Sequence, residues 1–244
     1  MRRRTLLFLL VAAIVALGCA RLGMWQLARL GERRARNALV VRRLGEPVED
    51  VARIARDTAG VRYRRIEATG RFDYAHEMVL AARMHEGSPG VNVVTPLRIG
   101  RGDTVLLVNR GWIYSPDGTS ADLSRWREAE GADVTVRGFA LPMSRGAGSP
   151  DVGAGRPNAV RWLDPADAAR RAGGPVLPFV LVQTDSSVRP GSFPLARLEP
   201  PPLDEGPHQS YAIQWFAFAL IAVAGGVFVA LNERKGRGRV VDTR

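Results

Sequence analysis

Apolar residues of this 244-residue chain concentrate in two runs, one at each end. The C-terminal run, Tyr211 to Leu231, has 21 residues without a charge and would be roughly 31 Å long as a helix, about the thickness of a bilayer's hydrocarbon core. Aromatic residues open the run and a basic segment follows it, as is typical of spanning helices. The pattern predicts a transmembrane helix over residues 208–231, with a buried helix of a soluble protein as the alternative.

The N-terminal run follows three arginines and covers residues 5–20, which is short for a span. It extends to residue 27 if Arg21 directs its guanidinium toward the far interface, where Trp25 would also lie. This predicts a transmembrane helix over residues 5–27. A cleaved signal peptide has the same basic start and apolar middle, and Leu17-Gly-Cys19 resembles a lipoprotein processing site, so both alternatives stay open.

The net charge of +11 is concentrated at the two ends. Residues 1–31 contribute +5, residues 232–244 contribute +3, and the long middle segment contributes only +3. Because positive flanks stay on the cytoplasmic side, we expect residues 1–4 and the basic tail 232–244 in the cytoplasm, and residues 28–207 as an extracytoplasmic domain. Nucleic-acid binding is not expected, because 34 of the 35 basic residues are Arg and the middle segment is nearly balanced.

The middle segment alternates short apolar runs with Gly, Pro and Asp turns, which is typical of strands. The run Val-Leu-Leu-Val before Asn109 is continuously apolar, as expected for a central strand covered on both faces. The fold class is therefore α+β: two transmembrane helices flank one mainly antiparallel sheet, able to close toward a barrel, with a few helices. The expected strands are Tyr63–Phe72, Met78–Arg83, Val91–Ile99, Thr104–Asn109, Val134–Phe139 and Val176–Gln183.

Helical signals in the same domain are fewer. Asp164 is a good N-cap for a helix that continues to Ala172, with Pro165 in its first position and two glycines after it. Residues 31–43 can continue the first helix outward, and residues 48–59 can hold a helical piece that ends at Gly60. Residues 141–157 are rich in Gly, Ser and Pro and predict a flexible loop.

Candidate chemistry is sparse. The single cysteine, Cys19, lies inside the first span, so the outer domain has no intramolecular disulfide. No spacing suits a metal site, and no nucleophile has an oriented base nearby. His76 and Glu77 could form a general acid–base pair, but a solvated strand edge is the favoured interpretation. We therefore expect no catalytic residues and no enzyme activity.

Short motifs spread over residues 23–220 resemble, in the same order, the surfeit-locus family of cytochrome c oxidase assembly factors. Each motif is weak alone, and together between two spans they are specific. They are Gly23-Met-Trp-Gln-Leu-Ala-Arg, Gly70-Arg-Phe-Asp with Glu77 and Arg83, Ser88-Pro-Gly with Val94-Thr-Pro-Leu, Val108-Asn-Arg-Gly-Trp-Ile, Val136-Arg-Gly, Pro157-Asn with Trp162, and His208 followed by Tyr211-Ala-Ile-Gln-Trp-Phe.

The resemblance implies a bacterial inner-membrane protein that helps supply haem a to oxidase subunit I, with haem a synthase as a further possible partner. It also implies haem binding by His208 and Trp215, with His208 as the hypothetical ligand of the haem iron. Elementary chemistry agrees, because a neutral imidazole ligates haem iron well and a membrane interface suits a macrocycle with an apolar tail. Two rivals remain: a scaffold that binds the oxidase without haem, and a membrane-anchored enzyme.

Each candidate residue also has a plainer interpretation. His208 can be an interfacial polar residue without a ligand, and Trp215 a member of the aromatic belt. If the helix begins near His208, residues 208, 211, 212 and 215 share one face. Gly111 is expected at a strand end or a close packing site, and Trp112 is core or a docking anchor, with core favoured. The residues assigned structural or docking roles are Gly23, Trp25, Gln26, Arg29, Arg110, Gly111, Trp112 and Tyr211.

Overall fold

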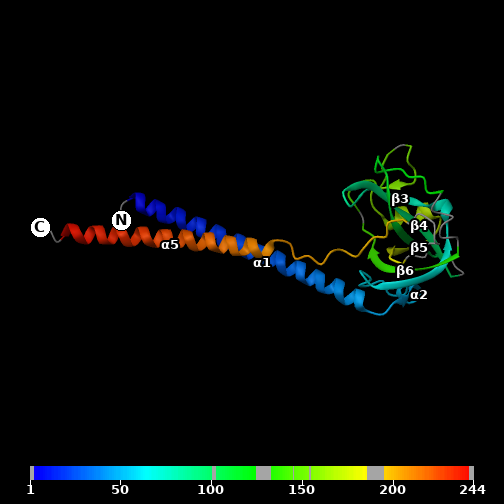
Figure 1. The fold of residues 1–244 in the computed structure, drawn as a ribbon, viewed down its shortest axis with the longest axis horizontal. Coiled ribbons are helices and arrows are strands. Elements are labelled where there is room, and N and C mark those ends of the chain that lie inside the picture. Colours follow the sequence, from blue (N-terminus) through cyan, green and yellow to red (C-terminus); the bar gives the residue numbers. More distant parts are fainter. Residues whose placement is uncertain are drawn as a thin grey trace. The chain divides into compact units, whose positions relative to one another are not determined.

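The protein consists of two units, shown in Figure 1. A computed structural model describes residues 3–100, 103–124, 133–144, 146–153, 155–185 and 195–241, with side chains as far as residue 234. The first unit combines Met1–Leu39 with Pro202–Arg244, and the second is Val40–Pro201. The two ends of the chain thus form one unit, and the middle segment forms the other.

Two long helices make up the first unit: α1, Arg3–Gly45, and α5, His208–Val241. Both contain a window that is long and apolar enough to cross a membrane, with mean hydropathy 2.4 in α1 and 2.1 in α5. The two expected apolar helices are therefore confirmed. At 43 residues, α1 also confirms the expected continuation through residues 31–43.

The helices pack side by side in antiparallel directions (Figure 1). Gly23 near the middle of α1 lies against Phe216 near the start of α5, and Leu9 in α1 lies against Gly226 further along α5. Residue numbers therefore increase along α1 in the direction in which they decrease along α5. The first turn of α1 and the far end of α5 lie at the same end of the pair.

The second unit is a mixed β-sheet whose central strands close into a barrel. Five strands form the closed ring β2–β6–β8–β5–β4, and the pairing of β4 with β2 completes it. Three of the ladders, β1–β2, β3–β7 and β5–β8, are parallel, and the others are antiparallel. The strands are β1 Glu49–Asp50, β2 Arg65–Phe72, β3 Met78–His85, β4 Ser88–Ile99, β5 Val105–Tyr114, β6 Asp133–Pro142, β7 Ala159–Val160 and β8 Val176–Gln183.

Alternating side chains of β5 enter two different hydrophobic clusters. Leu106 and Val108 pack inside the barrel with residues of β2, β6 and β8, whereas Val105 and Leu107 pack outside it with residues of β3 and α4 (Pro165–Ala172). A strand covered on both faces has no solvated side, so its sequence is apolar without alternation. This explains the continuous Val-Leu-Leu-Val run.

The remaining short elements partly match the expectations. Helix α4 has Asp164 as N-cap, accepting hydrogen bonds from the N–H groups of Ala166 and Asp167, and Gly173 as C-cap, as predicted. The helical piece expected over residues 48–59 is mostly wrong, because residues 49–50 form β1 and α2 covers only Val51–Ile54. Ile54 explains the short helix: it is 1% exposed and belongs to the barrel core, so tertiary packing fixes this turn. A 3₁₀ turn, η1, covers Tyr74–His76.

The loop expected over residues 141–157 begins later than predicted, after Pro142. Strand β6 continues to Pro142, where it still pairs with Phe179 of β8. Asp151 then forms an isolated bridge with Val160 of β7. Positions 145 and 154 lie outside the described residues, as do residues 186–194.

Candidate functional site

The start of α5 places His208 in the first helical position. The carbonyl of Pro207 accepts a hydrogen bond from the Tyr211 amide at 3.1 Å and another from the Ser210 hydroxyl at 2.9 Å. Gly206 before it has φ +68°, a left-handed conformation that glycine adopts without strain. A glycine–proline pair therefore turns the chain sharply into the helix, and the expected helix start at His208 is confirmed.

The imidazole of His208 is held by a side chain of the other helix. Its Nδ1 lies 2.7 Å from Oε1 of Gln26 in α1. An amide oxygen only accepts hydrogen bonds, so a neutral imidazole in this contact carries its proton on Nδ1 and donates it. Nε2 then keeps its lone pair, and such an imidazole is a ready ligand for a metal or a haem iron.

Two polar contacts tie the segment before His208 to α1. Arg34 donates two hydrogen bonds to the carboxylate of Glu205, each at 2.9 Å, and the Asn37 side chain donates to the Asp204 carbonyl at 3.2 Å. The hydrogen bonds from Arg34 lower the pKa of Glu205, so this carboxylate is ionised at neutral pH. The pair is solvent-exposed, so it fixes the course of the chain and adds little stability.

Trp215 and Tyr211 lie on the same stripe of α5 as His208. Ala212 on this stripe is 2% exposed and faces α1, whereas Tyr211 is 46% exposed and Trp215 is half-buried. Seven residues correspond to roughly 10 Å along the helix axis, so the indole lies about two turns further into the apolar segment than the imidazole. The Trp215 ring meets Phe218 edge-on, with ring centroids 6.0 Å apart. The stripe therefore runs along one edge of the helix pair.

The motif at residues 23–29 divides between two faces of α1. A side chain at Gly23 would place its Cβ 2.8 Å from the ring of Phe216, so glycine is what allows this aromatic ring to lie against the α1 backbone. Gln26, three residues on, reaches His208. Trp25 is 54% exposed, and Arg29 pairs with Glu32 of its own helix at 2.5 Å. Only Gly23 and Gln26 of this motif join the His208 site.

The other expected cluster, Arg110-Gly111-Trp112, lies in the barrel domain, in the middle of β5. Arg110 is completely buried, and its guanidinium donates to Glu77 Oε1 at 2.9 Å. Thr95 donates to the same carboxylate oxygen at 2.7 Å. The guanidinium also lies 5.1 Å from the ring centroid of Phe72. The interpretation of Glu77 as part of a solvated strand edge is therefore wrong, because the carboxylate is the buried partner of this arginine.

Gly111 and Trp112 connect β5 to the segment around Ala196. Gly111 has φ +136°, and a Cβ there would lie 2.6 Å from the Ala196 carbonyl oxygen. The expected close packing is correct, but the expected strand end is wrong, because the ladder with β4 shifts register here and the strand continues to Tyr114. The Trp112 amide donates to the Ala196 carbonyl, and its indole N–H donates to the Arg83 carbonyl at 3.0 Å. These contacts are structural.

Sequence reasoning missed the pairing of Glu77 with Arg110, and it missed Arg34 and Glu205 altogether. A signal existed for the first: an arginine inside a continuous apolar strand must be buried, and a buried arginine needs a carboxylate. A sequence signal also existed for Arg34 and Glu205, because the acidic residues just before His208 have the opposite charge to the arginines of residues 33–36. Among the described residues, no group of three or more His, Cys, Asp or Glu side chains could hold a metal ion.

Comparisons with known proteins point to one family. A model of the SURF1 family matches residues 13–220, which covers most of α1, the whole barrel domain and the start of α5. A SURF1-like protein of Monosiga brevicollis is 28% identical over 242 residues, covering 95% of this chain and 88% of its own length. An uncharacterized SURF1-like protein of Mycobacterium bovis is 26% identical over 237 residues, covering 96% of this chain and 85% of its own length.

Proposed function

The chain belongs to the SURF1 family, whose members are oxidase assembly factors and generally not enzymes, and we propose that it binds haem a during assembly of cytochrome c oxidase subunit I. In this proposal His208 supplies an axial nitrogen to the iron and Trp215 flanks the macrocycle. The protein acts as a carrier or chaperone. It therefore binds haem a transiently, and the redox chemistry of haem a takes place in the oxidase.

One observation carries the proposal: Gln26 fixes the imidazole of His208 through Nδ1, and no described residue forms a hydrogen bond with Nε2. Ligating histidines commonly donate their second ring N–H to a carbonyl or carboxylate, which sets the tautomer and orients the ring. The amide oxygen of Gln26, 2.7 Å from Nδ1, is such an acceptor. A histidine present only for polarity at an interface would have no need of this partner.

The surroundings of His208 also suit an amphipathic macrocycle. The exposed ring of Tyr211 and the half-buried indole of Trp215 line the same edge of the helix pair and offer flat apolar surfaces. Just outside, the segment 204–206 is polar and solvent-exposed, where ionisable groups of the ligand can remain hydrated. The apolar tail of haem a would then follow α5 into the bilayer.

The proposed location is the bacterial inner membrane, with both termini in the cytoplasm. Two candidate spans and the excess of positive charge at both ends support this topology. The barrel domain and the His208 site then lie on the outer side, where haem a would be handed to subunit I. Haem a synthase is a further candidate partner on the same side.

The proposal is tested in cells that lack the protein and receive plasmid-borne variants. His208→Ala should restore little haem a in the oxidase, whereas the matched control Gln209→Ala, an exposed neighbour on the same turn, should restore the parent level. Trp215→Phe keeps an apolar ring and should have an intermediate effect. Immunoblotting must show equal amounts of each variant in the membrane.

The outcomes separate the rival functions. Full rescue by His208→Ala, with no rescue by the empty plasmid, would favour a scaffold that binds the oxidase without haem. Normal oxidase in cells without the protein, when haem a is limiting, would contradict a role in assembly altogether.

A further inference from the structure

Arg21 lies within the apolar part of the helix pair. Gln26 meets His208 and Leu9 meets Gly226, so residues 9–26 of α1 run beside residues 208–226 of α5. Arg21 is five residues from Gln26, which places its Cα about 7 Å deeper along the axis than the start of α5. An ionised side chain at such a depth is costly, and in membrane proteins it usually marks a binding site.

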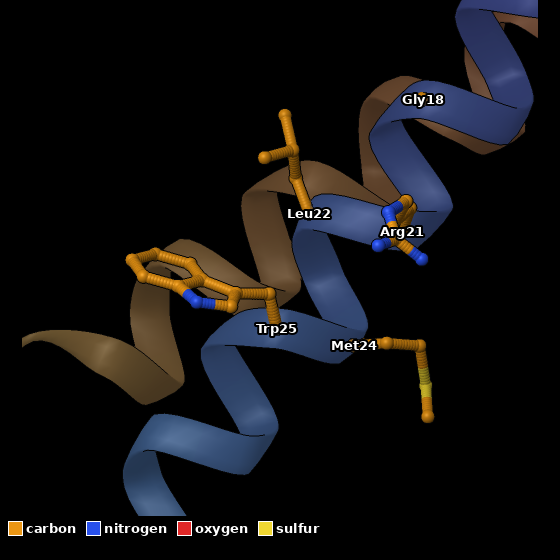
Figure 2. Close-up of a pocket in the computed structure, with 5 residues that line it drawn as sticks. All are labelled: Gly18, Arg21, Leu22, Met24 and Trp25. Carbon is orange, nitrogen blue, oxygen red and sulfur yellow. The ribbon is translucent and has the colours of Figure 1, made fainter.

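The guanidinium borders a hollow of about 770 Å³ on one side of α1 (Figure 2). Its lining residues are Gly18, Arg21, Leu22, Met24 and Trp25. Four of the lining residues lie on one stripe of α1: Gly18, Arg21, Leu22 and Trp25. A different stripe, which carries Gly23 and Gln26, faces α5, and the lining stripe faces away from it. Nothing lies within 4 Å of the position that a Cβ of Gly18 would occupy, so the deep end of the hollow is open.

No described residue neutralises this cation. Within the described part of the chain, Arg21 forms no hydrogen bond or ion pair, and residues 1–31 contain five arginines and no acid. Trp25 is 54% exposed and Met24 is 62% exposed, so the hollow offers apolar walls beside an uncompensated positive charge. An anion that pairs with Arg21 is therefore not supplied by the described part of the chain.

We propose that this hollow binds an anionic phospholipid of the outer leaflet. Its phosphate pairs with the Arg21 guanidinium, its glycerol region lies beside Trp25, and one acyl chain follows Leu22 and Gly18 inward. The order of the lining residues matches an amphiphile, because Trp25 lies nearest the interface, Arg21 one turn deeper and Gly18 another turn deeper. A long arginine side chain also reaches outward to phosphate level, and its planar fork binds phosphate through two hydrogen bonds.

Charge and depth favour a lipid over the carboxylate of a partner helix. A partner's acid would have to enter the hydrocarbon layer to meet Arg21, which adds a second buried charge. A phospholipid already has its phosphate at the interface and its chains in the hydrocarbon layer. The inference does not depend on haem binding, because the two helix faces involved are different.

The full-length protein, reconstituted in phosphatidylcholine vesicles, provides the test. The vesicles contain a fixed fraction of lipid brominated on its acyl chains, either phosphatidylglycerol or phosphatidylcholine, and bromine quenches nearby tryptophan fluorescence. The chain has five tryptophans, so the contribution of Trp25 is obtained by difference from Trp25→Phe. The measured quantity is the ratio of quenching of Trp25 by the anionic lipid to that by the neutral lipid.

We expect a ratio of about five for the parent, the enrichment that one interfacial cation typically gives. Arg21→Gln should lower it to about one. Arg36→Gln, which removes an exposed arginine of the same helix beyond the span, should leave it unchanged.

A parent ratio of one, or an unchanged ratio in Arg21→Gln, would overturn the proposal. If the parent ratio is one and an oxidase subunit copurifies only when Arg21 is present, the hollow belongs to a partner's carboxylate instead. None of these readouts involves haem, so they are independent of the proposed function.

Discussion

Replacing Glu77 by Leu should strongly destabilise the barrel domain, because it removes a buried carboxylate that pairs with the buried Arg110 guanidinium. The two side chains are 1% and 0% exposed, and the charged atoms are 2.9 Å apart. Breaking a buried pair by removing one partner typically costs about 3–5 kcal/mol. Domains of this size have total stabilities of roughly 5–15 kcal/mol, so the variant loses a large share.

The assay is urea unfolding of the full-length protein in detergent, followed by the circular dichroism of the strands. With a denaturant slope of about 2 kcal/mol per molar urea, a loss of 3–5 kcal/mol moves the midpoint down by roughly 1.5–2.5 M. The matched control is Glu67→Leu, which breaks the largely exposed pair with Arg137 on the same domain. This control should cost less than about 1 kcal/mol.

The double variant Glu77→Leu with Arg110→Met decides whether the loss comes from breaking the buried ion pair. Replacing a buried pair by apolar residues of similar size is often nearly neutral, so the double variant should recover at least half of the loss. The remainder reflects Thr95, which donates to Glu77, and Phe72, which packs on the guanidinium. A double variant that is less stable than Glu77→Leu alone would refute the reasoning.

Three further predictions concern other parts of the chain. Gly111→Ala should destabilise the barrel by about 1–3 kcal/mol in the same assay, because φ is +136° and the added methyl group meets a carbonyl, whereas parent-like stability would exclude strain there. Burial opposes ionisation of Asp73, but hydrogen bonds from His76 and Arg98 outweigh burial and lower the pKa of this carboxyl group. The ionised Asp73 therefore stabilises the folded barrel at neutral pH, and this contribution disappears as the pH falls below the ordinary pKa of about 4. Asp73→Asn should therefore be less stable than the parent at pH 7 and should lose less stability on acidification. A periplasmic reporter fused near Gly146 should be active and one fused after the last residue inactive, and the reverse pattern would contradict the topology.

Much of the fold could be predicted because its signals are local. Helix α4 follows from Asp164, Pro165 and the glycines after it, and β8 has the predicted bounds, Val176–Gln183. The apolar part of each long helix follows from its length and composition alone. The parallel pairing of β8 with β5 could not be predicted, because nothing in either strand's own sequence specifies which distant strand lies beside it.

Two features that the sequence did not predict involve polar groups paired with distant residues. Strand β5 was expected to end at Asn109, because a charged Arg110 interrupts the apolar pattern, yet the strand continues to Tyr114 with that charge neutralised inside. The contact of His208 with Gln26 joins residues 182 positions apart, so spacing alone could not identify it. Polar residues in such positions need their partners located in space before their role becomes clear.

The most direct test of the central claim is the absorption spectrum of the protein purified from cells that make haem a, compared between the parent and His208→Ala. The parent should copurify with haem a, and the variant should lose most of it while still inserting in the membrane, because Tyr211 to Leu231 keeps the whole apolar span. Gln26→Leu, which removes the acceptor of Nδ1–H, should weaken haem retention without abolishing it. If His208→Ala carries as much haem a as the parent, the imidazole is not the ligand and the proposed function of this site is contradicted.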